Sequence, residues 1–533
     1  MHKTTPPCVD HPITLESYWR KYAEWPGVIA LLTGCGALLG SAGLEWRETV
    51  KILAVLALSL AMTRQMPKRR WTKSLALCWY CLLTVDVGLT GSLQAAYGLS
   101  LESPTVLTAL GNTHWHETKE FLASLSLLWS VLFCVWFALF YTALWRLGQP
   151  RAEGWRLEAC VLITIFGMLH LNPTAREKNP IFGWTKIYTR NAAFRDDIAK
   201  LTKQRNDAAI WLAAQPVKYV GPSRRTVVLV LGESINRTNW QIHGYLRETS
   251  PRLSALRDEL LVMNDVVSSE GTTVASIRSM LTLGTDEMRG PGVTALARLA
   301  GYKTYWLTNQ VDRYLWGRFA SEADFRAQTN SNDDGRRGRS LDEALQPLVS
   351  AALSDPAPHK FIVVHMLGAH PHYDLRYPAT WAFFQDDDPI DAQLISKNRW
   401  PWIRNARKHY DRAMRYHDAQ LGDIIDRLRQ LPAGEAALLY TADHGQEVGH
   451  TRNFAGHAPG HIAGHAVPMI VWPRSESRKA NMVESRAYST SRLEGTLASL
   501  LRIETPLANP ADDVLGEWFR DAPRFIGTLP YPG

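Results

Sequence analysis

Residues 226–234 of this 533-residue chain read Thr-Val-Val-Leu-Val-Leu-Gly-Glu-Ser, a nearly unbroken apolar run that ends in glycine and a carboxylate. Such a run is typical of a strand that is covered on both faces. Similar short runs recur at residues 303–308, 360–366, 436–441 and 467–472, and helical patterns separate them at residues 293–300, 341–352 and 404–430. This alternation predicts an α/β domain with a mostly parallel sheet and helices on both faces.

Carboxylates and histidines follow several of these predicted strands. Glu233 follows the first, Asp443 and His444 follow residues 436–441, and a Gly-Ala-His-Pro-His segment at residues 368–372 follows residues 360–366. A further histidine-rich segment lies shortly before the last run and contains His457, His461 and His465. Ligands of such sheets bind beyond the carboxyl ends of the strands. A lone histidine is more often structural, but four such segments at one edge predict a metal site with the ligand types of zinc.

A hydroxyl group for nucleophilic catalysis is found in residues 268–276, which read Ser-Ser-Glu-Gly-Thr-Thr-Val-Ala-Ser before a helical stretch. A hydroxyl at a helix N-terminus lies where the helix dipole and free N–H groups favour negative charge. A metal bound to its oxygen would make it a nucleophile. The alternative is that Thr272 or Thr273 only caps the helix.

Composition restricts the class of protein. The net charge of +8 is mild for this length, and no long Lys/Arg tract of the kind that binds nucleic acid is present. All six cysteines precede residue 161, and five of them lie in apolar runs, where a thiol behaves as a small hydrophobic group. The second half of the chain therefore depends on an ordinary hydrophobic core and not on disulfides.

Five apolar segments before residue 172 predict about five transmembrane helices, at residues 26–44, 50–62, 74–97, 121–145 and 159–171. With a cytoplasmic N-terminus, eleven Lys and Arg residues lie on the inner side and three on the outer side. This asymmetry fits the positive-inside rule and puts everything after the fifth segment outside the cytoplasm. Asp86 lies in the third segment. A charged side chain is costly inside a bilayer, so Asp86 either has a functional role or lies near the interface between membrane and water.

The chain thus divides into three predicted parts. Residues 1–171 form a transmembrane domain, and residues 226–533 form the catalytic α/β domain outside the cytoplasm. Residues 172–225 are polar and basic with interspersed aromatic residues, which suits linker helices on the membrane surface, or an ordinary linker in the second half of this stretch.

Four motifs carry a resemblance to a known family. Gly232-Glu233-Ser234, Gly271-Thr272-Thr273, the His-Met-Leu-Gly-Ala-His-Pro stretch at residues 365–371, and Asp443-His444-Gly445 occur in the order of the bacterial inner-membrane phosphoethanolamine transferases. These enzymes belong to the alkaline phosphatase/sulfatase superfamily. The resemblance covers nearly the whole chain and is strongest to the branch that modifies periplasmic glucans. The loop at residues 113–120 also resembles the family's Thr-x-x-x-Glu element between membrane helices.

The resemblance implies roles for individual residues. Glu233, Asp443 and His444 would bind the catalytic Zn²⁺ together with Thr273, which would be the nucleophile, because Ser276 follows it by three as in the family pattern. His370 would hold the transferred phosphate or a second zinc ion, with His465 or His457 as its partner. Thr113 and Glu117 would contact the head group of the lipid donor.

The implied reaction is a metal-dependent transfer of phosphoethanolamine through a phospho-threonine intermediate. The donor would be a phospholipid, phosphatidylethanolamine by the resemblance, and the acceptor a periplasmic glycan or a lipid of the envelope. Two alternatives remain: transfer of phosphoglycerol by the same fold, or a catalytically inactive membrane protein that binds lipid or a partner.

The sequence departs from the family pattern in two places. The lipid A branch has disulfides near this site, whereas Ser269 and Ser279 stand at two of those positions here. The family often has Asp-His-Gly-Glu, whereas Gln446 follows Gly445 in this chain, which leaves the number of zinc ions open. No Cys/Ser-x-Pro-x-Arg sequence is present, so a sulfatase that matures a formylglycine is not expected.

Overall fold

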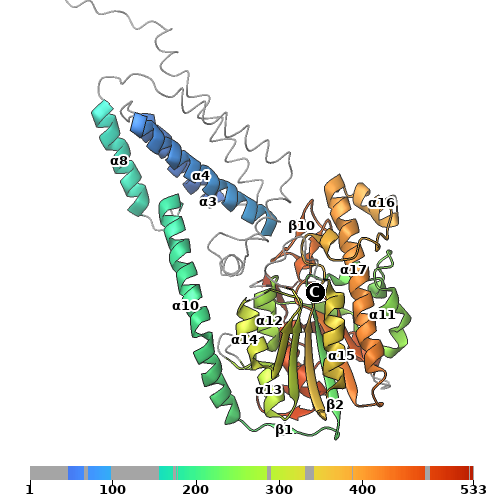
Figure 1. Cartoon of the computed structure of the whole chain (residues 1–533). Coiled ribbons are helices and arrows are strands. Elements are labelled where there is room, and N and C mark those ends of the chain that lie inside the picture. The colour runs from blue at the N-terminus through green and yellow to red at the C-terminus, as the bar shows by residue number, and fades with distance from the viewer. Residues whose placement is uncertain are drawn as a thin grey trace, which may run out of the picture. The chain divides into compact units, whose positions relative to one another are not determined.

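The computed structural model describes residues 46–64, 70–97, 155–171, 176, 178–284, 290–311, 313–330, 341–386, 388–474, 480–526 and 529–531 (Figure 1). The chain forms two compact units, one with the helices before residue 190 and one with the residues that follow. Each unit is described by itself.

The first unit consists of helices. They are α3 (Trp46–Arg64), α4 (Arg70–Tyr97), α8 (Trp155–Leu171) and the start of α10 (Pro180–Ala213). Three of the predicted apolar segments coincide with α3, α4 and α8, while the segments at residues 26–44 and 121–145 lie outside the described residues. Among the described residues, no helix has the combined length and apolar character needed to cross a bilayer. The predicted number of five crossings is therefore not confirmed.

Polar contacts join the helices of this unit. The carboxylate of Glu48 in α3 lies 2.8 Å from the Lys178 ammonium group. The Trp184 indole in α10 donates a hydrogen bond of 2.8 Å to Asp86 Oδ1 in α4. Asp86 thus has a partner in α10, and this continuous helix occupies most of the stretch predicted as linker helices.

A seven-stranded sheet forms the centre of the second unit, in the order β3-β11-β8-β2-β7-β5-β6. The strands are β2 (Arg225–Gly232), β3 (Leu261–Met263), β5 (Lys303–Thr308), β6 (Phe325–Gln328), β7 (His359–His365), β8 (Ala436–Ala442) and β11 (Met469–Trp472). Every residue of β2 is buried, as its apolar run predicts, and β2 pairs in parallel with both β7 and β8. The prediction of a mostly parallel α/β sheet is confirmed.

One strand runs against the others. β11 is antiparallel to both β8 and β3, which makes the sheet mixed. Because β11 enters the sheet from the edge at which β8 leaves it, the residues just before β11 lie at the carboxyl edge of the parallel strands. Because β11 is antiparallel, the histidine-rich segment that precedes it lies at the same edge of the sheet as Asp443.

Helices flank this sheet in two groups. α15 (Gln346–Ser354) and α17 (Pro401–Leu428) pack against each other and against β7 and β8. α12 (Thr273–Leu281), α13 (Val293–Leu299) and α19 (Leu493–Leu500) form the other group, in which α13 contacts β5. The sheet lies between the two groups in Figure 1. Burial of each large aliphatic side chain in such a core contributes about 1.5–3 kcal/mol.

Shorter elements complete the second unit. The helices are α11 (Pro251–Ala255), α14 (Arg313–Arg318), α16 (Pro389–Ser396) and α18 (Ala480–Glu484). Small strand pairs join β1 (Lys218–Tyr219) with β13 (Ile503–Glu504), β4 (Asp265–Val267) with β12 (Ala487–Ser489), β9 (Glu447–Val448) with β10 (Ala455–Gly456), and β14 (Phe525–Ile526) with β15 (Leu529–Pro530).

Candidate active site

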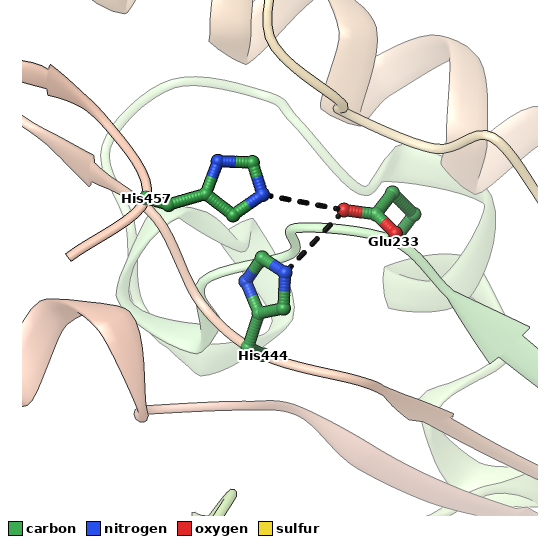
Figure 2. Close-up of side chains that lie close together, drawn as sticks. All are labelled: Glu233, His444 and His457. Atoms are coloured by element: carbon green, nitrogen blue, oxygen red, sulfur yellow. Dashed lines mark ion pairs between the residues drawn. The ribbon is translucent and has the colours of Figure 1, made fainter. Parts of the chain in front are cut away.

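Four segments that are distant in the sequence meet beyond the carboxyl end of β2. Glu233 follows β2, the pair Asp443 and His444 follows β8, Thr273 begins α12, and His457 follows β10. Figure 2 shows the side chains of Glu233, His444 and His457 pointing toward one another. The atoms that these three residues offer as ligands all lie within 4.8 Å of one another.

Glu233 lies at the centre of this cluster and is fully buried. Its Oε2 atom accepts a hydrogen bond of 2.9 Å from the Thr273 hydroxyl, and its Oε1 atom accepts one of 2.6 Å from the Ser234 hydroxyl. Gly368, at φ +53°, packs against the backbone here, and a Cβ atom at this position would lie 2.6 Å from the Glu233 carbonyl oxygen. The loop after β7 therefore requires glycine to approach the end of β2 this closely.

Asp443 and His444 are held by the backbone around them. The backbone N–H groups of Ser234 and His444 donate hydrogen bonds of 3.0 and 2.7 Å to Asp443 Oδ1. His444 Nδ1 lies 2.8 Å from the Gly445 carbonyl oxygen, so Nδ1 carries the proton and donates. The other ring nitrogen, Nε2, faces Glu233 and Asp443.

Thr273 is the first residue of α12 and is half-buried. The residue before it, Thr272, occupies the N-cap position but makes no side-chain capping bond. The Thr273 hydroxyl points instead to Glu233. A Cβ atom at Gly271 would lie 2.6 Å from Pro459 Cα, so glycine lets the start of α12 pack directly on the segment that carries His457. The geometry distinguishes the two threonines and places the hydroxyl of Thr273 in the cluster.

Burial strongly shifts the pKa values of the ionisable groups in the site. It raises the pKa of Glu233 to about 8, and the nearby charge of Asp443 adds to the increase. Burial also raises the pKa of Asp443 to about 6. For His457, burial lowers the pKa well below its usual value, and His444 and His370 lower it further. The cluster thus concentrates carboxylates and neutral imidazoles where water cannot stabilise their charges.

The donor set fits a zinc ion. Asp443 Oδ2 and His444 Nε2 are buried, and neither has a hydrogen-bond partner within the part of the chain that is described. His444 Nε2 lies 3.5 Å from Glu233 Oε1 and 3.4 Å from Asp443 Oδ2. Two ligands of a tetrahedral zinc ion, each about 2.0–2.1 Å from the metal, are separated by about 3.3–3.4 Å. A divalent cation would also compensate the two buried carboxylates.

The other predicted histidines lie in different surroundings. The rings of His370 and His457 are 5.9 Å apart between centroids, and His457 Nε2 lies 4.0 Å from Glu233 Oε1. Both nitrogens of His465 contact the backbone: Nδ1 donates to the Ser268 carbonyl oxygen at 2.7 Å, and Gly460 N–H donates to Nε2 at 3.1 Å. The structure therefore brings His457 to the cluster, whereas His465 braces the surrounding loops. Thr113 and Glu117 lie outside the described residues.

Two further residues belong to the surroundings of the site: Gln310, which was not predicted, and Gln446, which the sequence marks as a departure from the family pattern. Gln310 Nε2 donates hydrogen bonds to Glu233 Oε2 at 3.0 Å and to the Met366 carbonyl oxygen at 3.1 Å. It follows β5, so the rule about strand ends could have found it. Gln446 is fully buried, and neither polar atom of its amide has a partner among the residues that are placed.

Comparison with known proteins identifies relatives of this chain. The family model described as Sulfatase matches residues 225–503. The phosphoethanolamine transferase EptC of Escherichia coli K12 is 27% identical over 505 residues, which cover 86% of this chain and 83% of the relative. The phosphoethanolamine transferase CptA of Salmonella typhimurium is 28% identical over 476 residues, 80% of each protein.

Solved structures agree with the fold. The crystal structure of the C-terminal periplasmic domain of EptC from E. coli, in complex with Zn, has a TM-score of 0.52 at 28% identity and covers 59% of this chain and 92% of that domain. The integral membrane protein EptA of Neisseria meningitidis has a TM-score of 0.57 at 20% identity and covers 87% and 90% of the two chains. The family match across residues 225–503 shows that the chain belongs to the Sulfatase family, and phosphoethanolamine transferases resemble it over most of its length.

Proposed function

We propose that this chain transfers phosphoethanolamine from a phospholipid, phosphatidylethanolamine, to an acceptor of the bacterial envelope. The observation that carries the proposal is the hydrogen bond of 2.9 Å between the Thr273 hydroxyl and Glu233, within a cluster whose nitrogen–oxygen distances match those between zinc ligands. The names of relatives that are similar over most of the chain supply the transferred group. The acceptor is a glycan or a lipid.

Thr273 is the nucleophile in this mechanism. Its Oγ1 forms a bond to the phosphorus of the donor, and the bond from phosphorus to the diacylglycerol oxygen breaks. Glu233 Oε2, which already accepts the hydrogen bond of the hydroxyl, takes the proton that Thr273 loses and passes it to the leaving oxygen, so that diacylglycerol departs as a neutral alcohol. An acceptor hydroxyl then attacks the same phosphorus and gives its proton to Thr273 Oγ1 as the bond from that oxygen to phosphorus breaks; a protonated acceptor phosphate can react in the same way. When bound, Zn²⁺ would supply Lewis-acid stabilisation of the attacking and phosphoryl oxygens.

The remaining residues bind and orient the groups. Glu233, Asp443 and His444 would hold the zinc ion together with Thr273. His370 and His457, whose pKa values are lowered mainly by burial, are neutral imidazoles that can donate hydrogen bonds to phosphoryl oxygens. Gln310 fixes Glu233 Oε2.

We also infer that the chain is anchored in the inner membrane, with residues 1–171 as a transmembrane domain of five helices, residues 172–225 as interfacial linker helices and residues 226–533 in the periplasm. The five apolar segments and the eleven-to-three asymmetry of basic residues support this arrangement. Two relatives point the same way, because one is an integral membrane protein and the other is represented by its periplasmic domain. Thr113 and Glu117 would contact the lipid head group.

The test is to incubate the full-length protein with donor lipid and no acceptor, and to map the adduct by peptide mass spectrometry. Thr273 should carry phosphoethanolamine; a phosphoglycerol adduct would identify the other head group. Thr273→Ala should abolish the adduct and lower turnover by at least about 10²–10⁴-fold, the scale of one general acid–base group. Thr273→Ser should retain part of both, because it keeps the hydroxyl.

Two further variants complete the test. Thr272→Ala is the matched control and should keep its adduct, because the Thr272 side chain makes no capping bond. Asp443→Asn should lose zinc, measured by elemental analysis, together with activity. Near-normal turnover in Thr273→Ala would show that the nucleophile has been assigned to the wrong residue.

A further inference from the structure

An exposed aromatic patch lies on the α/β unit outside the candidate active site. Its centre is the pair Trp400 and Trp402, which are 44% and 55% exposed and whose rings lie 4.6 Å apart between centroids. Ile395, at the end of α16, is also about half exposed. Lys397 and Arg399 lie between the isoleucine and the tryptophans in the sequence. These five residues are called the tryptophan patch.

Hydrogen bonds fix the tryptophan patch and tie it to the segment before His457. The turn after α16 has Asn398 in the left-handed conformation, at φ 55°. Trp400 N–H donates to Asn453 Oδ1 at 2.8 Å, and Asn453 Nδ2 donates to the Asn398 carbonyl oxygen at 3.2 Å. Asn453 lies four residues before His457, and four residues span at most about 15 Å. The patch is therefore close to the candidate active site, and α16 lies at the same end of the sheet as β10 in Figure 1.

The sequence around the patch is strongly basic. Residues 392–410 carry five Lys and Arg residues and no Asp or Glu. Two of these cations are compensated by acids that precede the stretch. Arg404 pairs with Asp391 at 3.0 Å, and Lys408 pairs with Asp386 at 2.5 Å.

Two of the other three cations lie at the surface without a carboxylate. Arg407 is buried and interacts with the charge of Asp411, so it adds nothing to the surface. Lys397 is exposed and Arg399 is half-buried, and among the described residues neither lies in an ion pair. Arg399 donates instead to three backbone carbonyl oxygens, at 2.8, 3.1 and 3.3 Å, which leaves its charge in place. Glu447, the acid of the neighbouring turn, is fully buried and accepts hydrogen bonds from its own turn.

Another exposed tryptophan of this unit has the opposite surroundings. Trp518 is 70% exposed, but residues 503–520 contain four acids and a single arginine. Exposed tryptophan together with lysine and arginine, as in the tryptophan patch, is typical of segments at a membrane surface. Trp518 therefore serves as a comparison within the same molecule.

The size and chemistry of the patch favour a lipid surface over a protein partner. Two indoles of about 150–250 Å² each, roughly half exposed, offer about 150–250 Å² together, whereas a stable protein interface needs about 800 Å² per partner. Indoles concentrate at the headgroup level of bilayers, where the N–H group finds acceptors. No acceptor for the indole N–H of Trp400 or Trp402 is found in the described part of the chain. Lysine and arginine beside them are attracted to anionic headgroups.

We propose that the tryptophan patch docks the catalytic domain on the surface of a bilayer that contains anionic phospholipid. The two indoles lie at the headgroup level, and Lys397 and Arg399 bind lipid phosphate groups. The proposal goes beyond the proposed function, because it assigns a surface of the domain and not a step of the reaction. Docking through this patch would turn the end of the sheet that carries Glu233 toward the membrane.

The test maps contact with lipid in the full-length protein. The protein is reconstituted in nanodiscs of phosphatidylcholine, alone or mixed with phosphatidylglycerol, and a photoreactive phosphatidylcholine is the tracer in both. After illumination, tryptic peptides are quantified by mass spectrometry. In the mixed nanodiscs, residues 400–404, Trp-Pro-Trp-Ile-Arg, should be labelled several-fold more than residues 503–520, which carry Trp518. Phosphatidylglycerol should increase the labelling of residues 400–404, and added salt should lower it.

A charge reversal and its control complete the experiment. Lys397→Glu should lower the labelling of residues 400–404 in the mixed nanodiscs by about fivefold or more, because each cation near an anionic surface changes the affinity by about that factor. Arg298→Glu, which reverses an exposed charge on α13, should leave the labelling unchanged.

Equal labelling of the two peptides, or labelling of residues 400–404 that responds neither to phosphatidylglycerol nor to Lys397→Glu, overturns the proposal. Light scattering of the solubilised protein covers the alternative partner: a dimer that Trp402→Ser dissociates would assign the patch to a second copy and overturn membrane docking. The adduct on Thr273 tests the proposed function separately, so loss of docking with an intact adduct refutes only the docking surface.

Discussion

A disulfide should form between Ser269→Cys and Ser279→Cys and stabilise the catalytic domain. The two serine Oγ atoms lie 3.2 Å apart, one in the loop before α12 and one in α12 itself. A disulfide needs its sulfurs at about 2.0 Å, so only a small approach of the two side chains is required. The closed loop of residues 269–279 gives a loss of unfolded-state entropy worth about 3 kcal/mol at 25 °C.

This free energy can be converted into a shift of melting temperature. Unfolding entropy is about 2.1 cal/mol/K per residue, so a domain of roughly 300 residues gains about 5 °C from 3 kcal/mol. Calorimetry of the full-length double variant, with and without reductant, measures the shift. The parent protein should show no such effect of reductant on this transition, because no cysteine follows residue 160.

The single variants Ser269→Cys and Ser279→Cys are the controls, and both should retain free thiols. Activity should persist in the oxidised double variant, because the bridge ties down the segment that carries Thr273 without touching its hydroxyl. If thiol labelling shows that the double variant stays reduced under oxidising conditions, or if oxidation lowers the melting temperature, the placement of the two serines is wrong.

Three other results are expected. Gln310→Ala should lower kcat by about 10–100-fold with little change in KM, because loss of a hydrogen bond to a charged group costs about 1.5–3 kcal/mol and frees Glu233 Oε2; normal kcat would exclude this positioning role. Burial raises the pKa of Glu322 to about 7 from 4.5, so its contribution to stability is present at low pH and is lost as pH rises through 7. Chemical denaturation of Glu322→Gln and the parent protein should therefore diverge by roughly 3 kcal/mol between pH 4 and 8, with the variant less sensitive to pH; parallel pH profiles would contradict this. A reporter that is active only in the periplasm, fused after Gly533, should be active, and an inactive reporter on stably inserted protein would refute the topology.

The centre of the sheet could be predicted because its strands are buried on both faces. The run of residues 226–231 is apolar at nearly every position, which predicts that neither face of the strand is exposed. The strand, β2, is buried throughout. Once the strands were placed, the rule that ligands gather at their carboxyl ends was enough to bring Glu233 and Asp443 together. The short edge strands β3 and β6 were not predicted, because three or four residues carry little periodic pattern, whether they are buried as in β3 or mostly exposed as in β6.

The residues of a strand do not determine whether it pairs parallel or antiparallel with its neighbours. The run at residues 467–472 predicts a strand, but its antiparallel pairing depends on how the chain returns to the sheet. For the same reason spacing could not decide between His457 and His465. Packing of Gly271 on Pro459 and the bonds of His465 to the backbone distinguish the two histidines, and both depend on segments far apart in the sequence.

Gln310 was missed for a different reason. Its amide is neutral, so a search for carboxylates, imidazoles and hydroxyls passes over it, although it follows a correctly predicted strand. A search of every strand end for any side chain with a hydrogen-bonding group would have included it.

The reversal of β11 also has a consequence for how enzymes of this architecture diverge. The chain leaves the sheet at Ala442 and returns at Met469 on the same edge, so both ends of this excursion are pinned by neighbouring strands. Residues can be inserted or removed within it without shifting the register of any strand. Since the excursion supplies His444 and His457, a change in its length can alter the surroundings of the site while the pairing of β8 with β11 is kept.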